Sequence, residues 1–583
     1  MSMMTIEQPT KPISEQENRN TAGKPKSMHV GFLKIDFVIR TLQKIGVDKI
    51  FDEAFTIEGK EPDIPYGISG MILIANIICS PLPLYRIADM FQKGLFEYDL
   101  KGTLGIDIMF EQLNDDRFGN FLDRMQTVGC RKIFAEIMTN ALMEFEVKLQ
   151  NINYDTTTKT MWGTYEYLEN TDQSSLHITY GYNKQKRKDK KQIVVGLGVS
   201  GGFVVDAKVL SGNKDDKTYN YENVKDFVEI TEKADGNLYY IADSVAGNTT
   251  FFEEAQNKGV LYITRLPDNY KLTISQFEKL LDEWKEAETI KIYNISGEER
   301  IYRILEGTGE HDGVLLKTCV YFNHGMMKQK YQTIEKRTQK EKKSLSNKIS
   351  KITKNPFFES EADAKKVGDD FVKTHEKKLK SHDVTYQVEE IKTPARGKKA
   401  KDPSKQKYTT KFRLDFTFEE KENLLELQYQ LLMTECMFML VSNDLSIDGE
   451  KMITEYKTQS SVEVKFRQLK NDYHPNSLYV KKPERVEALM YLSLIGLQVC
   501  SLIEHVVRGG LKDDAAFIRV SGNKKEFSPT FVQILNLLES GGRVLYWENG
   551  VEVRSLSKEL TEDQLKILKY MGISVDEIIG IIN

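Results

Sequence analysis

The pattern of apolar residues changes at Val147, and this change limits the fold more than any other feature of the 583-residue chain. Upstream, apolar residues recur with the helical period, as in FLKIDFVIRTLQKIG and RKIFAEIMTNALMEFE. Downstream, KLQNINYDTTT, LHITYGYN, QIVVGLGVS and FVVDAKVL have the pattern of consecutive strands. The strand-like segments NLYYIADS and VLYITRLP then alternate with helix-like segments. Strands followed by alternating strands and helices predict an α/β core.

Changes in composition and periodicity divide the chain into six predicted segments. The strand pattern of the core stops after VLYITRLP and returns in MFMLVSND, and short strands with basic stretches lie between. The segments are a disordered tail (1–27), an all-α N-terminal domain (28–146), the first part of the core (147–267), a β-containing basic insertion (268–415), the second part of the core (416–510) and a small helical C-terminal appendage (511–583).

The overall composition excludes several classes of protein. Lys and Arg number 82 against 86 Asp and Glu, a net charge of -4, which excludes a uniformly basic nucleic-acid coat. Five cysteines without paired spacing give no disulfide or zinc framework and suit a reducing compartment. The polar N-terminus lacks the apolar core of a signal peptide, and the longest apolar run, MILIANIICSPLPL, is too short to span a membrane. We therefore expect a soluble cytoplasmic protein without membrane partners.

Basic residues gather in three places despite the balanced total. From Lys328 to Lys354, ten Lys or Arg residues stand against Glu335 and Glu341. A second basic loop, from Pro394 to Lys407, lies between two strand-like segments that are expected to pair as a hairpin. Such charge is either solvated surface or a set of contacts to DNA phosphates. The third place is a loop of the core that contains Arg187, Lys188, Lys190 and Lys191.

Three carboxylates stand where a metal site would require them. Asp155 and Asp243 each lie at the end of a predicted strand, and Glu463 lies in a predicted helix. Carboxylates in this arrangement can hold two divalent cations about 3.5–4 Å apart and so catalyse phosphoryl transfer. Oxygen ligands favour Mg²⁺ or Mn²⁺. Each carboxylate taken alone is weak evidence, because among 86 acidic residues a strand-end Asp is far more often a turn or cap residue than a metal ligand.

The segment around Glu463 carries a polar stripe. Tyr456, Glu463 and Lys470 are spaced by seven in ITEYKTQSSVEVKFRQLKNDY, which we predict to be one long helix. Seven residues fall only about 20° short of two full turns, so the three side chains share a face, and Gln459 joins it three residues after Tyr456. This stripe suits a phosphate backbone beside a metal site, although an ordinary solvated face is the simpler interpretation.

These residues resemble the DDE transposases of bacterial and archaeal insertion sequences, in the IS4-like superfamily, and most closely its IS1634 group. The helical signature of that family is Tyr, two residues, Arg, three residues, Glu, six residues, Lys. The chain matches it with Tyr456, Gln459, Glu463 and Lys470, with Gln in place of the usual Arg. Asp155 and Asp243 match the contexts of the two family aspartates, and the resemblance covers about residues 28–508.

The resemblance implies an RNase H-like core in which Asp155, Asp243 and Glu463 are the catalytic carboxylates and hold two Mg²⁺ or Mn²⁺ ions. It implies hydrolysis at transposon ends, followed by attack of the exposed 3′-hydroxyl on target DNA. The implied partners are double-stranded DNA, as terminal inverted repeats and as target, and a second copy of the chain in a homodimeric end-pairing complex. The implied DNA contacts come from the N-terminal domain and from Tyr456, Gln459, Lys470, Arg187, Lys188, Lys190 and Lys191.

Two other interpretations remain open, namely a domesticated DNA-binding descendant without catalysis and a metal-dependent nuclease without strand transfer. A GxGxxG pattern formed by Gly196, Gly198 and Gly201 precedes a strand-like segment rather than a helix, so we predict a hairpin turn and no dinucleotide site. Trp284 lies on a predicted amphipathic helix and is expected to pack in the core.

Overall fold

The structure is a computed structural model that describes residues 28–580, except 57–61, 93–95, 166–175, 185, 233, 235, 245–247, 294–297, 355–356, 396–406 and 472–479. The predicted tail at 1–27 and most of the basic loop after Pro394 lie outside the described residues. The chain forms two compact units, the first made of residues 1–215 and 460–583 and the second of residues 216–459.

The first unit combines a helical bundle with three antiparallel strands. Strands β3 (Ile152–Thr160), β4 (Gln192–Ser200) and β5 (Phe203–Ser211) lie in the order β5–β4–β3. The bundle is made of α1 (Leu33–Ile45), α2 (Val47–Ala54), α3 (Tyr66–Cys79), α5 (Asp115–Val128), α6 (Cys130–Glu144) and α15 (Pro483–Asp513).

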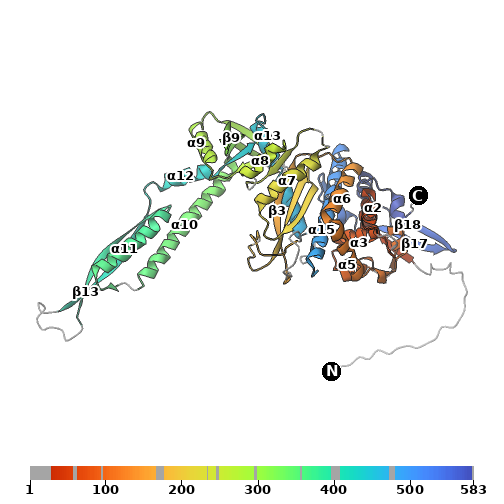
Figure 1. The fold of residues 1–583 in the computed structure, drawn as a ribbon, viewed down its shortest axis with the longest axis horizontal. Coiled ribbons are helices and arrows are strands. Elements are labelled where there is room, and N and C mark those ends of the chain that lie inside the picture. Colours follow the sequence, from red (N-terminus) through yellow and green to blue (C-terminus); the bar gives the residue numbers. More distant parts are fainter. Residues whose placement is uncertain are drawn as a thin grey trace, which may run out of the picture. The chain divides into compact units, whose positions relative to one another are not determined.

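Helix α15 is the central helix of this unit. It packs against β5 and against α3, α5 and α6, and these three helices lie around it in Figure 1. Its length and hydropathy would suffice to cross a membrane, but 94% of its most apolar window is buried inside the protein. The bent pair formed by α3 and the 3-10 helix Leu84–Phe91 is also long and apolar enough to cross a membrane. Because α15 is buried, its high hydropathy is that of a helix in the core of a protein.

The prediction that residues 28–146 are all-α is wrong. Strand β1 (Met28–Phe32) pairs in parallel with β2 (Glu97–Tyr98) and antiparallel with β17 (Gly542–Glu548) from the far end of the chain. Strand β18 (Val551–Leu556) completes this sheet in the order β18–β17–β1–β2. Strand β1 is only five residues long and its partner lies more than 500 residues away, so its local pattern carries no strand signal.

The C-terminal appendage likewise contains strands that we did not predict, beside the helices α16 (Phe531–Leu537) and α17 (Glu562–Tyr570) that we did. Asn549 and Gly550 both have positive φ, at 52° and 79°, in the turn between β17 and β18. An Asn-Gly pair between alternating apolar residues is a strong hairpin signal, because type I′ turns need positive φ at both positions. The signal was therefore present in the sequence.

A buried ion-pair network joins the two ends of the chain within the first unit. Arg543 on β17 is fully buried, with Nη1 2.7 Å from Asp36 Oδ2 and Nε 2.7 Å from Asp99 Oδ2. Thr103 Oγ1 also accepts a hydrogen bond from Arg543. The appendage is therefore part of the core of the first unit rather than an addition to it.

The second unit contains a six-stranded sheet in the order β6–β7–β14–β10–β9–β8. Only the pair β6–β7 is parallel. The strands are β6 (Tyr239–Ala242), β7 (Leu261–Leu266), β14 (Met437–Ser442), β10 (Val314–Asn323), β9 (Glu299–His311) and β8 (Glu288–Tyr293). The predicted helices are present as α7 (Asp216–Thr231), α8 (Thr249–Asn257) and α9 (Lys271–Asp282).

Part of the predicted insertion belongs to this sheet. Strand β10 pairs with β14, so β8, β9 and β10 continue the sheet of β6 and β7. The remainder has a small core of its own around Leu345, Phe371 and Val384. Its elements are α10 (Met327–Ile352), β11 (Phe357–Phe358), α11 (Glu361–His375), β12 (His382–Pro394), β13 (Tyr408–Glu420) and α12 (Leu424–Glu435).

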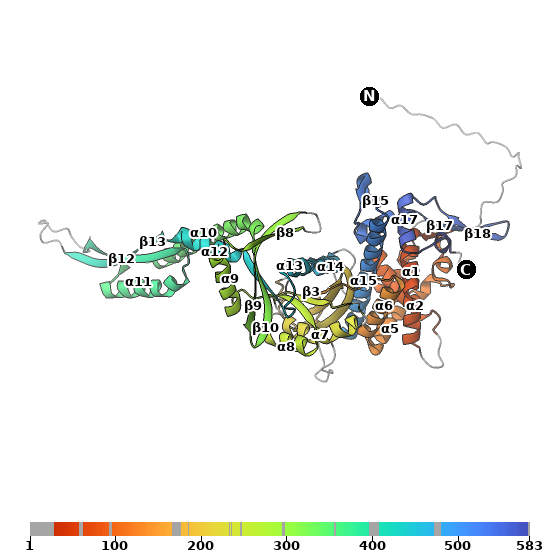
Figure 2. The same ribbon diagram turned by 90° about the horizontal axis from the view of Figure 1, so that it is seen from above.

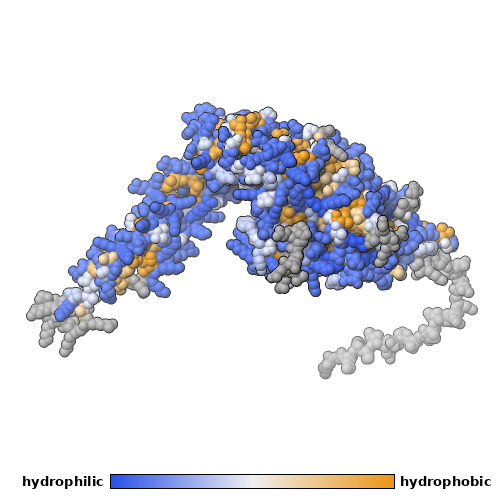
Figure 3. Space-filling model, viewed as in Figure 1, coloured by the Kyte–Doolittle hydropathy of each residue, from blue (hydrophilic) through white to orange (hydrophobic). Residues whose placement is uncertain are grey.

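The hairpin predicted on either side of the second basic loop is confirmed. Strands β12 and β13 pair antiparallel from His382 opposite Glu420 to Pro394 opposite Tyr408, with α11 packed beside them (Figure 2). The first basic stretch forms helix α10, which packs against α12. The face of this segment seen in Figure 3 is largely hydrophilic, in keeping with its many exposed Lys residues.

One further prediction is confirmed, the one for Trp284 holds only in part, and one is wrong. Gly201 and Gly202, both with positive φ, turn the chain from β4 into β5, so the GxGxxG pattern belongs to a hairpin. Trp284 lies after the end of α9 rather than on it and is only partly buried, with its ring perpendicular to that of Phe322 and 4.9 Å between centroids. The segment at 176–183, predicted as a strand, forms only a single bridge, between Thr179 and Gln192, because β4 begins at Gln192.

Candidate functional site

Asp155 lies in the middle of β3 rather than at a strand end, because the β-branched threonines after it extend the strand to Thr160. Its neighbours Tyr154 and Thr156 are buried, whereas the Asp155 side chain retains 26% of its surface exposure. Oδ1 of Asp155 accepts a hydrogen bond from the Thr156 N–H at 2.7 Å and lies 3.6 Å from Lys184 Nζ. The carboxylate is thus accessible and already accompanied by a cation.

Two more lysines lie on the face of β3 that carries Asp155. Alternate residues of a strand share a face, so Asp155, Thr157 and Lys159 project together. Lys470 Nζ donates a hydrogen bond to Thr157 Oγ1 at 2.5 Å. Desolvation, aided by the nearby Lys184 ammonium, lowers the pKa of Lys470, while Asp155 acts in the opposite direction. Desolvation and Lys470 lower the pKa of Lys159 to about 8.

Helix α14 (Ser460–Asn471) brings Glu463 to the same strands. It packs against β3 and β4, and Glu463 is exposed in its first turn. Glu463 and Lys470 are seven residues apart on this helix and therefore share a face, about 10.5 Å apart along its axis. Asp155, Glu463 and Lys470 thus lie on two elements of one unit that pack together.

A buried ion pair holds α14 against α15. Lys465 Nζ and Glu504 Oε2 are 2.6 Å apart, and both side chains are almost fully buried. Glu504 Oε1 also accepts a hydrogen bond from Arg508 at 2.8 Å and one from the backbone N–H of Phe531 at 3.3 Å. The orientation of the helix that carries Glu463 therefore depends on contacts with the C-terminal part of the chain.

The single long helix predicted around this stripe is wrong. Helix α13 (Gly449–Lys457) ends before α14 begins, and Thr458 and Gln459 form a turn between them. The N–H groups of Thr458 and Gln459 bond to carbonyls three residues earlier. Thr and Ser side chains around the break compete for backbone hydrogen bonds, which favours a helix end. The stripe of four therefore reduces to Glu463 and Lys470, while Tyr456 packs against the apolar core of the second unit.

Asp243 directly follows β6 in the second unit, at the strand end where we predicted it. Its side chain is partly exposed, and its backbone carbonyl accepts a hydrogen bond from Thr264 Oγ1 at 2.7 Å. Asp155 and Glu463 belong to the first unit and Asp243 to the second. Among the described residues, no group of three or more His, Cys, Asp or Glu side chains is arranged to hold a metal ion.

Three of the four predicted DNA contacts in the basic loop of the core are engaged with protein groups, namely Arg187, Lys190 and Lys191. Arg187 makes two hydrogen bonds of 2.8 Å to Asp189, and this contact lowers the pKa of Asp189 to about 2. Lys191 Nζ donates to the backbone carbonyls of Thr164 and Tyr165.

The same loop surrounds an exposed Trp162, which the sequence analysis missed. Arg187 and Lys190 lie over its ring, 5.3 and 4.7 Å from the centroid. Lys188 is exposed, without an ion pair among the described side chains. Lys159 was also missed, although its position four residues after Asp155 places both on one face of a strand.

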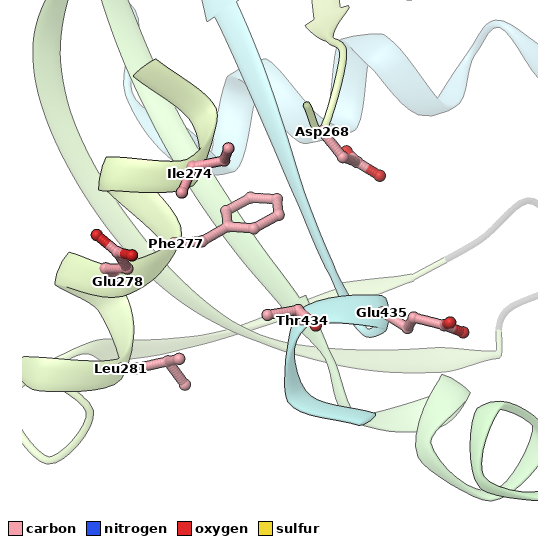
Figure 4. A pocket seen from close by; sticks show the side chains of 7 residues that line it. All are labelled: Asp268, Ile274, Phe277, Glu278, Leu281, Thr434 and Glu435. Carbon is pink, nitrogen blue, oxygen red and sulfur yellow. The ribbon is translucent and has the colours of Figure 1, made fainter. Parts of the chain in front are cut away.

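Two cavities among the described residues are not lined by any of the predicted site residues. Figure 4 shows one of about 330 Å³ in the second unit, between α9 and the end of α12. Its apolar wall includes Ile274 and Phe277, and the carboxylates of Asp268 and Glu435 lie at its edge. Another, of about 440 Å³, lies between α3 and the start of α15 in the first unit. The predicted site residues Asp155 and Glu463 lie on β3 and α14, where both side chains are accessible.

Comparison with known proteins gives one family for most of the chain. A family model described as a transposase DDE domain matches residues 159–498, more than half of the chain, and a domain of unknown function (DUF4277) matches residues 27–139. The first match includes Asp243 and Glu463 and begins four residues after Asp155. Among curated proteins there is no match. A solved piggyBac transposase synaptic complex with hairpin DNA aligns at 9% identity and a TM-score of 0.35, covering 87% of this chain and 78% of that one.

Proposed function

Because the chain belongs to the family of transposases with a DDE domain, we propose that it cuts DNA at transposon ends and joins the ends to target DNA. The observation that carries this proposal is the environment of Asp155. An accessible carboxylate on β3 lies beside two ammonium groups, and α14 brings Glu463 to the same strands. Such a surface suits a phosphodiester backbone, because cations attract the phosphate while the carboxylates remain available to a metal.

Asp155, Asp243 and Glu463 would hold the divalent cations that DDE transposases use. The donor set fits Mg²⁺ or Mn²⁺, because it consists of carboxylate oxygens, and Asp155 already accepts a cation, Lys184, at 3.6 Å. When bound, two such ions would activate the attacking oxygen and stabilise the leaving oxygen.

The surrounding residues of the chain orient the DNA. Lys470 and Lys184 would contact phosphate oxygens next to the cut, and Lys470 is held in position by Thr157. The turn that holds Gln459 would supply a neutral hydrogen-bond donor where relatives of the IS1634 group carry Arg. Among the loop cations, Lys188 has the exposure that a phosphate contact requires, whereas Arg187, Lys190 and Lys191 would act by shaping the loop.

The substrates would be the terminal inverted repeats of an IS4-like element and its target DNA, in a bacterial or archaeal cytoplasm. Pairing of two ends implies a homodimer in the working complex. The order of chemical events would be hydrolysis at each end, then attack by the new 3′-hydroxyl on the target strand.

The test is strand cleavage of a duplex that carries the terminal repeat flanking the gene, in Mg²⁺. Asp155→Ala, Asp243→Ala and Glu463→Ala should each abolish cleavage and preserve duplex binding, since they remove metal ligands and no phosphate contact. Asp107→Ala, an 81% exposed aspartate of the first unit, is the matched control and should cleave normally. Full cleavage by any one of the three variants would remove that residue from the site.

Two outcomes would favour the other interpretations. If the wild-type chain binds the repeat but cleaves nothing in Mg²⁺ or Mn²⁺, it is a non-catalytic DNA-binding protein. If it cleaves but does not join pre-cut ends to a target plasmid, it is a nuclease without strand transfer.

A further inference from the structure

Trp162 is an exposed aromatic residue with cations on its ring. It lies two residues after the end of β3 at Thr160 and retains 61% of its surface exposure, although large apolar side chains are normally covered. Arg187 lies 5.3 Å and Lys190 4.7 Å from the ring centroid. Cation–π contacts of this kind orient the ring without burying it.

The loop around Trp162 is held in place by hydrogen bonds. Met161 N–H donates to the Lys191 carbonyl at 2.9 Å, and Lys191 Nζ fastens the chain beyond Trp162 through the Thr164 and Tyr165 carbonyls. The Arg187 guanidinium is fixed by its two bonds to Asp189. The indole therefore presents a fixed surface to solvent, and an incoming ligand would not have to order it.

Two further exposed aromatic rings lie on the chain that runs beside β3. Tyr180 is 57% and Tyr182 is 88% exposed. Their segment is attached to the strand through Asn183 Nδ2, which donates to Thr160 Oγ1 at 3.4 Å, and through the Lys184 N–H, which donates to Thr158 Oγ1 at 3.2 Å. Exposed lysines 186 and 188 follow in the same loop. In this stretch of chain, two exposed aromatic rings are thus followed closely by exposed lysines.

We propose that Trp162, with Tyr182 and the cations of this loop, binds unpaired bases of single-stranded DNA by stacking. Proteins that bind single strands without sequence preference combine aromatic stacking surfaces with cations that track the phosphates. Double-stranded DNA keeps its bases stacked on one another, so an exposed indole gains little from it, whereas an unpaired base offers a free π-face. The loop therefore discriminates single strands from duplex.

The inference rests on the proposed function, because it names the form of DNA that lies next to Asp155. Trp162 is seven residues beyond Asp155, five along β3 and two past its end, which span at most about 23 Å. A base unpaired within a few nucleotides of the cut would reach it. The loop would hold the strand that opens at the transposon end.

The experiment measures binding of the full chain, in EDTA, to fluorescein-labelled dT12 and to a 30-base-pair duplex by fluorescence anisotropy. Trp162→Ala should weaken dT12 binding about tenfold or more, the loss expected for one stacked base, and change duplex binding less than twofold. Trp162→Phe keeps a stacking ring and should retain most of the affinity. Trp547→Ala is the matched control, a 39% exposed Trp beside His29, and should change neither affinity.

The outcomes separate this inference from the proposed function. If wild-type protein binds the duplex and Trp162→Ala still binds dT12 with wild-type affinity, the stacking site is wrong and the transposase proposal stands. An equal loss for dT12 and duplex would also overturn it, since the loop would then be a general phosphate contact. If wild-type protein binds neither DNA, the proposed function itself fails. Quenching of Trp fluorescence by dT12 should be smaller in Trp162→Phe, which tests the contact independently of affinity.

Discussion

Lys470 on α14 donates a hydrogen bond to Thr157 on β3, two residues after Asp155, across 313 residues of sequence. The contact joins the helix that carries Glu463 to the strand that carries Asp155. It also holds a lysine whose pKa is lowered by desolvation. Under the proposed function, this ammonium group would contact a phosphate of the DNA.

Replacing Lys470 should reduce catalysis more than stability. Lys470→Met should lower the rate of end cleavage about tenfold or more, because a hydrogen bond to a charged group contributes about 1.5–3 kcal/mol. Removal of a desolvated charge should leave the thermal midpoint nearly unchanged. Cleavage rates on a terminal-repeat duplex and a thermal melt measure the two effects.

Thr157→Val is the companion variant, because it removes the hydrogen-bond acceptor and keeps the ammonium group. It should cleave within about threefold of wild type if the charge of Lys470 is what matters. Equal losses in both variants would instead mean that Lys470 acts by holding α14 on β3.

Arg543 is the residue of the first unit whose loss should destabilise it most sharply. Arg543→Met leaves the buried carboxylates of Asp36 and Asp99 without this partner, and breaking such a network costs about 3–5 kcal/mol. Urea unfolding followed by circular dichroism should show the corresponding shift in midpoint. Lys569→Met breaks an exposed pair with Asp514 and should shift it by less than about 1 kcal/mol. Similar shifts in both variants would contradict the assigned role of the network.

The same network should make stability depend on pH. Burial raises the pKa of Asp99, but Arg543, the Gly102 N–H and Arg554 outweigh it and lower the pKa overall. A carboxyl with a lowered pKa in the folded state stabilises the fold above its unfolded pKa of about 4, and this contribution is lost as the pH falls through the folded value. Asp99→Asn should therefore lose less stability between pH 5 and pH 3 than wild type does, as measured by urea midpoints. The exposed variant Asp107→Asn should follow the wild-type curve.

Features with a local cause were predictable from the sequence, and those set by distant partners were not. Asp243 at the end of β6 follows from the short apolar run before it, and the hairpin of β12 and β13 follows from two strand-like segments around a polar loop. The pairing of β1 with β17 had no such local cause.

The candidate site likewise contains residues that the sequence predicts and residues that only the fold brings together. The identities of Asp155 and Glu463 came from residue context and spacing, whereas the lysines around Asp155 did not. Lys184 and Lys470 approach it only because α14 and the loop after β3 fold back onto that strand. The break between α13 and α14 was missed because a spacing of seven predicts a common face only where a helix is continuous.

Helix α10 should supply the salt-sensitive part of DNA binding. Lys336, Lys340, Lys343 and Lys351 lie on its exposed face, opposite the buried Ile334 and Leu345, and extend about 22 Å along its axis. None of these four lysines forms an ion pair with a described residue, whereas Lys330 and Arg337 of the same helix pair with Glu435. Removal of the whole helix would also remove Leu345 from the small core, so charge must be changed without deletion.

The triple variant Lys336→Gln, Lys340→Gln and Lys343→Gln should therefore reduce the dependence of duplex affinity on salt. Each lost phosphate contact lowers the slope of log K against log salt by about 0.9, so the expected change is roughly 2–3. The matched control neutralises three exposed lysines on and just after the neighbouring helix α11, Lys366, Lys373 and Lys377, and should change the slope by less than about 1. Anisotropy titrations from 50 to 300 mM salt measure both slopes. An unchanged slope in the α10 variant would make this face an ordinary solvated surface.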